Sequence, residues 1–284
     1  MGNKEGIPIC LTDSEGTFEE QDRMIPNMSS KTERAISDQD QRWERFERKF
    51  FVSQEKTSYA RSLLSHICLR DSKYPEGRIN SLYFDTADLD QFQESDDGNC
   101  EREKIRIRWY DSPDNQEGEV PVYLELKSKK GFASRKRRRK ILVPAERLNR
   151  FQADNTIISR NVILQTLSEF GYFSEDLLLP VLLITYKRSR FIDILTGTRL
   201  SFDWRISSSL TAPGLGYSEP GLMLEGEVIE IKGPSMEIPI SLRPLSTIGI
   251  DWTRFSKYVF CLESQMEKPG SVGRFWPSGR IEPL

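Results

Sequence analysis

Apolar and charged residues alternate in several stretches between residues 42 and 266. In EKIRIRWY, residues 103–110, Ile105, Ile107 and Trp109 lie on one side of an extended chain, while Lys104 and Arg106 begin a charged side that continues with Arg108 and Tyr110. A period of two residues is typical of a half-buried β-strand. The same alternation is found in WERFERKFFV (43–52), PVYLELKSKK (121–130), SRKRRRKILV (134–143), LLITYKRSRFID (182–193), TRLSFDWRI (198–206) and LEGEVIEIKG (224–233).

Helical periodicity occurs between these strands, at about residues 55–70, 86–95, 145–170 and 252–266. Asp85 and Thr86 precede the second of these segments and are expected to cap it. The strands are too numerous and too closely spaced for βαβ crossovers. The pattern therefore predicts an α+β fold in which helices pack outside an antiparallel, barrel-like sheet.

Composition divides the 284-residue chain into one domain and two extensions. Residues 1–41 contain nine acidic and four basic residues without apolar periodicity, which is typical of a disordered acidic tail. Residues 269–284 are rich in proline and glycine and are expected to form a loose C-terminal extension. The folded domain is predicted to span residues 42–268. Its overall balance of 37% hydrophobic and 30% charged residues suits a soluble globular protein.

Several classes of protein are disfavoured by the sequence. No apolar run approaches the ~20 residues that span a bilayer, and the N-terminus lacks the pattern of a signal peptide, so a cytoplasmic location is expected. The four cysteines include no CxxC pair, which disfavours a zinc site or a disulfide scaffold. The single histidine, His66, lies in a predicted helix and is interpreted as a packing or surface residue.

The charged strand faces allow two interpretations from the pattern alone. In the first, the apolar face of a sheet packs against helices and the charged face is simply solvated. In the second, the charged faces converge in the lumen of a closed barrel. Several unpaired cations would then repel one another unless an anion occupies the lumen.

Eight motifs bear on the choice between a solvated sheet face and a charged lumen, and they occur in the order and spacing of a known family. They are ERKFFV (47–52), INSLYFDTADLDQF (79–92), EKIRIRWY, YLELKSKKG (123–131), ITYKRSRF (184–191), RLSFDWRI (199–206), VIEIKG (228–233) and RFSKY (254–258). Together they resemble the VTC domain of polyphosphate polymerases, which belongs with the CYTH proteins to the triphosphate tunnel metalloenzymes. The resemblance implies an eight-stranded antiparallel tunnel barrel that binds triphosphate and polyphosphate inside.

The resemblance also implies roles for individual residues. The residues implied as catalytic are Lys49, Arg106, Arg108, Lys127, Lys232 and Lys257. The residues implied to bind phosphate are Arg138, Arg188, Arg199, Arg254 and Ser256, joined by Lys140 on the same parity as Arg138. Glu230 corresponds to the metal ligand, with Glu47 and Glu125 as further candidates. Glu125 is more simply interpreted as neutralising Lys127.

Three positions depart from the family pattern. Arg254 and Arg138 stand where lysines are usual, which keeps the charge but changes the donor geometry. The CYTH relatives open with E-x-E-x-K, whereas this chain has Arg45, Glu47 and Lys49. The missing glutamate favours the polymerase branch over the hydrolase branch.

These residues suit phosphoryl transfer, which depends on positioning and charge neutralisation more than on a protein nucleophile. The sequence therefore predicts a polymerase that transfers the terminal phosphate of ATP to polyphosphate, with Mn²⁺ or Mg²⁺ as cofactor. A hydrolase of the same fold and a non-catalytic module that binds polyphosphate or nucleic acid are the alternatives. Nucleic acid is not the expected partner, although the segment 127–140 carries nine bases and no acids. A membrane protein is a further candidate partner.

Overall fold

The computed structural model describes residues 46–111, 118–131, 133–149, 157–211, 221–233, 237–247, 249–250, 252–253 and 255–266. The predicted acidic tail (1–41) and C-terminal extension (269–284) lie outside these ranges. One sheet of eleven strands dominates the described residues, and all of its pairings are antiparallel. The strands are β1 (Phe46–Val52), β2 (Cys68–Arg70), β3 (Glu76–Asp85), β4 (Glu101–Tyr110), β5 (Glu119–Lys130), β6 (Ala133–Pro144), β7 (Leu179–Asp193), β8 (Arg199–Leu210), β9 (Leu222–Met223), β10 (Glu227–Gly233) and β11 (Trp252–Thr253).

The strands follow the order β11-β1-β10-β8-β7-β3-β4-β5-β6, with β2 beside β7 and β9 beside β8. This is an open path, since no backbone pairing joins β6 to β11 within the described ranges. The predicted α+β class and antiparallel sheet are confirmed. The predicted closed barrel of eight strands is not confirmed, because the sheet has more strands and does not close.

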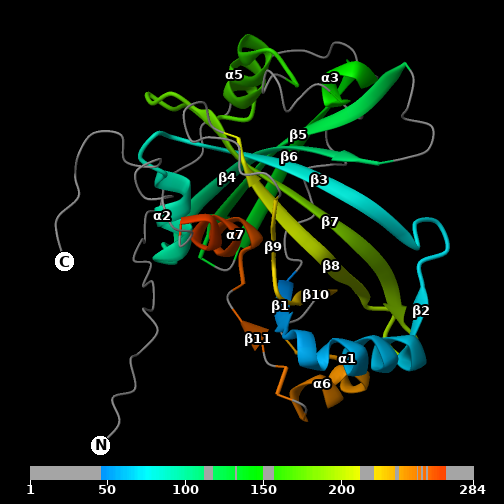
Figure 1. Cartoon of the computed structure of the whole chain (residues 1–284). Helices are drawn as coiled ribbons and strands as arrows, with labels where there is room; N and C mark the ends of the chain where they lie inside the picture. Colours follow the sequence, from blue (N-terminus) through cyan, green and yellow to red (C-terminus); the bar gives the residue numbers. More distant parts are fainter. Residues whose placement is uncertain are drawn as a thin grey trace, which may run out of the picture.

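Helices cover the sheet in three places (Figure 1). Helix α5 (Arg160–Glu169) packs on the apolar face of β3, β4 and β5, through Ile163 and Leu167. Helices α1 (Gln54–Ile67) and α6 (Pro244–Thr247) share a second core with β1, β8 and β10. The remaining helical segments are α2 (Asp90–Asp96), α3 (Ala145–Asn149), a 3₁₀ turn (Ile240–Leu242) and α7 (Lys257–Met266).

Helix α7 lies on the opposite, concave face of the sheet. Its residues Tyr258, Cys261 and Leu262 share a core with Ile184 of β7, whose side chain points to the same side as Tyr186 two residues later. The prediction that helices pack only outside the sheet is therefore wrong for α7. Among the described residues, α7 covers the apolar part of the concave face and leaves the charged part uncovered.

Helix boundaries differ from the predicted ones in four places. The first helix ends at Ile67, and residues 68–70 form β2 instead. The second begins at residue 90, and the third region divides into α3 and α5, with residues 150–156 outside the described ranges. The fourth begins at residue 257, since residues 252–253 form β11. None of the helices in the described ranges combines the length and apolar character that a membrane-spanning segment needs.

The side chains of Asp85 and Thr86 bind the first backbone amides of α2, as predicted, although the N-cap position itself is occupied by Leu89. Oδ1 of Asp85 accepts hydrogen bonds from the backbone amides of Thr86 (2.8 Å) and Gln91 (2.9 Å), and Oδ2 accepts one from the amide of Phe92 (3.0 Å). The Tyr258 hydroxyl also donates to Oδ2, at 2.6 Å. This buried carboxylate therefore holds the start of α2 against α7.

A β-bulge in β8 interrupts the strict alternation predicted for residues 198–206. Arg188 of β7 pairs with Asp203, whereas Thr185 pairs with Ser207, so β8 contains one extra residue between these pairs. Arg205 has a φ of 49° at this point. A bulge of this kind reverses which face the following residues occupy. Ile206 consequently joins the core under α7, although the alternation placed it on the opposite side from Asp203.

Candidate active site

The open part of the concave face forms a cavity of about 410 Å³. Strands β1, β3, β4, β5, β6, β7 and β10 and the N-terminal end of α7 contribute its walls. Tyr83, Ser95, Tyr186, Phe255 and Ser256 line it together with Glu47 and Glu230. Eleven lysines and arginines complete the lining, namely Lys49, Arg102, Lys104, Arg106, Arg108, Lys127, Lys129, Lys136, Arg188, Lys232 and Lys257. The charged strand faces therefore converge, as the lumen interpretation required.

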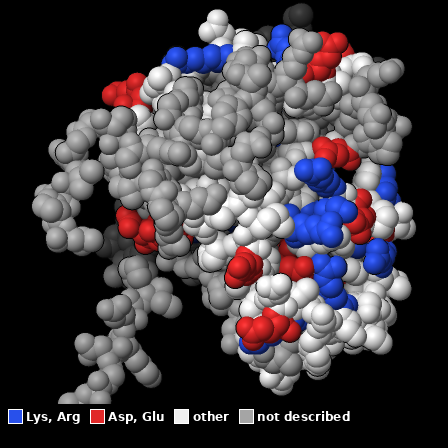
Figure 2. All heavy atoms as spheres, in the orientation of Figure 1, with Lys and Arg blue, Asp and Glu red and all other residues white. Residues whose placement is uncertain are grey.

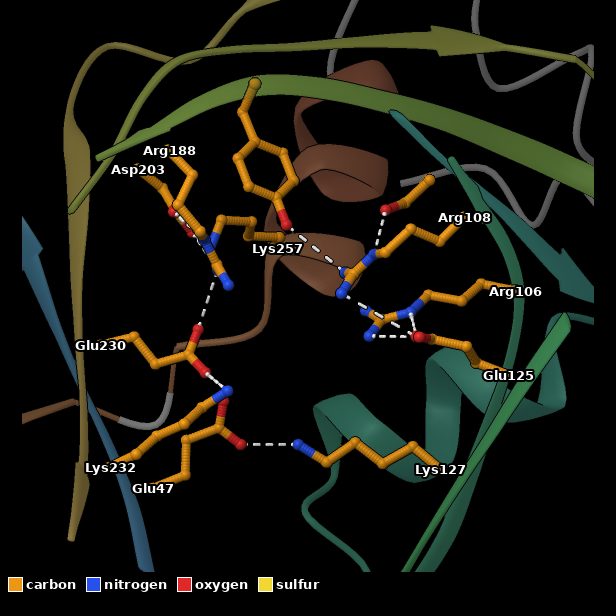
Figure 3. A network of polar contacts seen from close by, with 12 residues as sticks. Glu47, Arg106, Arg108, Glu125, Lys127, Arg188, Asp203, Glu230, Lys232 and Lys257 are labelled. Atoms are coloured by element: carbon orange, nitrogen blue, oxygen red, sulfur yellow. Dashed lines mark hydrogen bonds and ion pairs between the residues drawn. The ribbon is translucent and has the colours of Figure 1, made fainter. Parts of the chain in front are cut away.

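One wall is organised around Asp203, whose side chain is fully buried (Figure 3). Oδ1 of Asp203 accepts from Nε of Arg188 at 2.6 Å, and Oδ2 accepts from the terminal nitrogen of the same guanidinium at 2.7 Å. Nζ of Lys257 lies 2.6 Å from Oδ2. Burial lowers the pKa of Lys257, but Asp203, Tyr186 and Glu230 together outweigh burial and the pKa ends above its ordinary value. Both cations are thus held in fixed positions.

The facing wall is organised around Glu125 of β5, which is 1% exposed. Oε2 of Glu125 lies 2.8 Å from the Arg106 guanidinium and 3.9 Å from that of Arg108, and Oε1 lies 2.6 Å from Nζ of Lys136. Burial raises the pKa of Glu125, but these cations outweigh it and leave the pKa far below its ordinary value. The Tyr83 hydroxyl accepts from Arg106 at 2.9 Å, so Arg106 is fixed at both ends.

Glu47 and Glu230 form a carboxylate pair between the two walls. Their carboxyl groups lie close enough to influence each other's pKa. Glu230 also lies 2.8 Å from Nζ of Lys232 and 3.1 Å from Arg188. Burial raises the pKa of Glu230, but Lys232, the contact with Glu47 and Arg188 together hold it well below its ordinary value. Glu47 is 2.7 Å from Nζ of Lys127, an ion pair that joins β1 to β5 across the cavity (Figure 3).

This pair suits a divalent cation that arrives with a phosphate ligand. Two adjacent carboxylates repel each other, and a hard cation between them relieves that repulsion. No group of three or more metal-binding side chains occurs in the described part of the chain. Magnesium-type ions commonly use one or two carboxylates and fill their remaining positions with water and substrate phosphates. Glu230 and Glu47 fit that arrangement, whereas Glu125 already has three cations around it.

A second kind of cation in the cavity lacks a carboxylate partner. Among the described residues, Lys49, Lys104 and Lys129 form no ion pair within 4 Å. Nζ of Lys104 donates instead to the Ser256 hydroxyl, at 2.7 Å. Burial, followed by Lys49 and Lys127, holds the pKa of Lys104 well below its ordinary value. Burial and Arg102 lower the pKa of Lys129 to about 8.

Most predicted site residues meet in this cavity. Its lining includes Lys49, Arg106, Arg108, Lys127, Arg188, Lys232, Ser256, Lys257, Glu47 and Glu230, and Glu125 lies directly behind Arg106. Arg138, Lys140 and Arg199 are exposed and lie outside the lining. The Arg138 guanidinium stacks on Tyr123 instead, 4.5 Å from the ring centre. Arg254 lies outside the described residues.

Five residues of the site were not predicted. Lys136, not Arg138, lines the cavity from β6, and Arg102, Lys104 and Lys129 extend it along β4 and β5. The alternation had placed these lysines on the charged face, so the signal was present. Asp203 is one of the few acids on the charged face of TRLSFDWRI, and nothing else in the sequence distinguishes it. Its role depends on the pairing of β7 with β8, which the sequence pattern does not specify.

The expectation of unpaired cations is wrong for much of the site. Arg106, Arg108 and Lys136 share Glu125, and Arg188 and Lys257 share Asp203. Glu125 was expected to neutralise Lys127, which pairs with Glu47 instead. The described residues that line or directly back the cavity include eleven cations and four acids, namely Glu47, Glu230, Glu125 and Asp203. The cavity therefore has an excess of seven positive charges when all of these groups are ionised. The outer surface differs, since the described part of the face in Figure 2 shows basic and acidic side chains side by side.

A profile of the VTC domain matches residues 44–266, most of the chain and nearly all of the residues that the structure describes. No curated protein sequence matches the chain.

The solved structures that match the chain do so at low sequence identity. A protein from Bacillus halodurans described as an adenylate cyclase is 19% identical, with a TM-score of 0.44, over 75% of this chain and 95% of that one. A protein from Vibrio parahaemolyticus with the same description is 12% identical, with a TM-score of 0.36, over 78% and 99%. The Mediator head module of Schizosaccharomyces pombe matches at 9% identity and a TM-score of 0.32, over 74% and 97%.

Proposed function

This chain belongs to the VTC domain family, and we propose that it is a polyphosphate polymerase that transfers the terminal phosphate of ATP to a polyphosphate chain inside the cavity. The observation that carries this proposal is the excess of seven cations in one enclosed space. A triphosphate carries about four negative charges, and its transfer depends mainly on positioning and electrostatic stabilisation. A polyanion is the ligand class that such a cavity fits.

The arginines of the two walls are suited to hold the transferred phosphate. Arg106 and Arg188 are each fixed by a buried carboxylate, so their guanidinium groups require little reorganisation when phosphate binds. Arginine forks bind phosphate oxygens bidentately. Lys257 and the Ser256 hydroxyl add donors at the start of α7, where the helix dipole favours an anion. The site thus surrounds a phosphate from several sides.

Glu230, with Glu47 beside it, would hold a Mn²⁺ or Mg²⁺ ion. When bound, such an ion neutralises phosphate charge and orients the group that is transferred. Lys232 and Arg188 keep Glu230 ionised, because their charges hold its pKa well below its ordinary value. Lys49 and Lys127 do the same for Glu47, whose pKa is also lowered although burial and Glu230 raise it.

Proton transfer to a protein base is not required in this reaction. The end of a polyphosphate chain is an oxygen that is already ionised, so it can attack without first losing a proton. In agreement, the cavity lining contains no histidine, and His66 lies exposed on α1. The phosphate bond that forms to the chain end and the one that breaks to ADP balance without any other reactant.

Incubation with ATP and Mn²⁺ or Mg²⁺, followed by separation of the products on a gel, tests the proposal. A polymerase yields long polyphosphate and an equivalent amount of ADP. Free phosphate as the only new product would identify a hydrolase, and no turnover despite tight tripolyphosphate binding would identify a binding module. Either result would overturn the proposed function.

A further inference from the structure

A second pocket lies on the convex face of the sheet, opposite the basic cavity, where α1 and β2 come together (Figure 1). Ser189 and Phe191 of β7 and Phe202 of β8 form its floor. Ser189 pairs in register with Phe202, and their chain neighbours Arg188 and Asp203 pair on the other face of the sheet, toward the basic cavity. We call this second pocket the α1 pocket.

The α1 pocket carries positive charge. Two arginines and no carboxylate line it among the described residues. Arg61 of α1 is already neutralised, since its Nη2 lies 2.6 Å from Oε1 of Glu227, and its guanidinium stacks 4.9 Å from the ring centre of Phe202. Arg70, at the end of β2, forms no ion pair within 4 Å with any residue that the structure describes. One positive charge at the rim of the pocket therefore lacks a counter-ion.

A buried hydroxyl on the floor also lacks a partner. Ser189 is 7% exposed, and in the described part of the chain its Oγ forms no hydrogen bond. Glu76 pairs with Ser189 in register, but it does not line the pocket. A buried polar group that is left without a hydrogen bond costs free energy, so an acceptor that reaches Ser189 stabilises the folded protein. An anionic oxygen is such an acceptor.

The remaining surface of the pocket is largely apolar. Leu64 of α1 faces the two phenylalanines of the floor, Phe191 and Phe202. The volume of about 280 Å³ falls just below the range of about 300–1,000 Å³ that is usual for drug-sized ligands. The pocket therefore suits a molecule with a small apolar body, about the size of one ring, in addition to its charged group. Inorganic phosphate would leave the apolar floor uncovered.

We propose that the α1 pocket binds a small organic anion, whose carboxylate or phosphate group lies against Arg70 and the Ser189 hydroxyl and whose apolar body lies on Phe191 and Phe202. This site is separate from the basic cavity and does not depend on the proposed phosphate transfer. The two sites share β7 and β8, so a bound anion lies directly behind the wall that holds Arg188.

Ligand-observed NMR titrations with benzoate, phenyl phosphate and benzyl alcohol test the proposal. The three probes have the same ring but differ in charge. We expect both anions to bind and benzyl alcohol to bind about tenfold more weakly or less, because it lacks a charge-assisted hydrogen bond. Each titration is repeated with excess tripolyphosphate, which competes for the basic cavity but has no apolar body for the α1 pocket. The affinity for benzoate should then change less than twofold.

Two variants locate the binding site. Arg70→Met should lower the affinity for benzoate by about tenfold, and Ser189→Ala should lower it by roughly threefold, because a neutral hydrogen bond is weaker than a charged one. Arg70 is exposed, so its replacement should leave the fold intact. Lys73→Met is the matched control, because Lys73 is an exposed cation of the next loop that does not line the pocket.

Binding of either anion in preference to benzyl alcohol, with loss in Arg70→Met and none in Lys73→Met, supports the proposal, and the tighter anion identifies the charged group. Several results would overturn it. These are failure of both anions to bind, equal affinity for benzoate and benzyl alcohol, unchanged affinity in Arg70→Met, or displacement of benzoate by tripolyphosphate. The last result would assign the probe to the basic cavity.

Discussion

At the residue scale, the cavity contains two kinds of cation that serve different purposes. Arg106 and Arg188 are held by buried carboxylates and are already oriented before a ligand binds. Lys104 and Lys129 lack such partners among the described residues, and their pKa values are lowered. Arginines in fixed positions recognise a phosphate group by the arrangement of its oxygens. The protonation of the lysines, by contrast, changes when an anionic ligand binds.

The first prediction concerns the carboxylate at the proposed metal position. Glu230→Gln should lower metal-dependent turnover by about 10²-fold or more, because an ion that stabilises phosphate charge would lose its ligand. Affinity for tripolyphosphate without metal should stay the same or rise, since a negative charge has left the cavity. Steady-state kinetics and metal-free calorimetry check both effects. Full activity of the variant would exclude Glu230 as the ligand.

The second prediction concerns Asp203, which is 0% exposed. Asp203→Asn should destabilise the fold by about 3–5 kcal/mol, because it removes the partner of two buried cations. Urea unfolding measures this. The control is Glu169→Gln, which alters an exposed pair with Arg139 and should leave the midpoint unchanged. Equal midpoints for the two variants would contradict the role assigned to Asp203.

At the element scale, period-two alternation predicted the strands better than their register. It placed Arg106, Lys127 and Glu230 on charged faces that do meet, because each of these strands is regular over its length. It failed after Asp203, where one extra residue in β8 turns Ile206 toward the concave face. The sequence offers no glycine at Arg205 to mark this bulge. The position of α7 was equally hidden, since an amphipathic helix fits either face of a sheet.

The third prediction tests this bulge. Arg205 adopts a φ of 49°, which a β-branched residue tolerates poorly. Arg205→Val should therefore lower stability by about 1–2 kcal/mol. Arg205→Gly should be nearly neutral, because relief of strain in the folded state offsets the greater freedom of the unfolded chain. Thermal unfolding of both variants measures the difference, and equal melting temperatures would mean that the backbone is unstrained at this position.

At the scale of the whole molecule, the ligand-free protein carries a charge imbalance that its fold must tolerate. Seven cations in the cavity have no compensating acid among the residues that line or back it. Burial and the neighbouring Arg106 and Arg108 lower the pKa of Lys136 to about 7, although Glu125 raises it. Near neutral pH, Lys136 is therefore partly deprotonated, which reduces the excess of positive charge in the cavity.

The fourth prediction is that the ligand-free protein becomes more stable between about pH 7 and pH 8.5. Lys136 and Lys129 have pKa values of about 7 and about 8 in the folded state, below those of an unfolded chain. The unfolded state thus binds more protons in this range, and stability rises with pH. We expect the melting temperature to increase by about 2 °C. Saturating tripolyphosphate should reverse the trend, and a flat profile without ligand would contradict the lowered pKa values.

The pairing of β1 with β10 has a consequence for how the protein is made. Lys49 of β1 lies opposite Glu230 of β10, so β1 is synthesised about 180 residues before the strand with which it pairs. At about 5–20 residues per second, ribosomes need roughly 10–40 s for that interval. During this time the apolar residues of β1, including Phe50 and Val52, have no strand to cover them. The nascent chain is therefore a candidate client for chaperones, and premature termination before β10 leaves a fragment without a complete cavity.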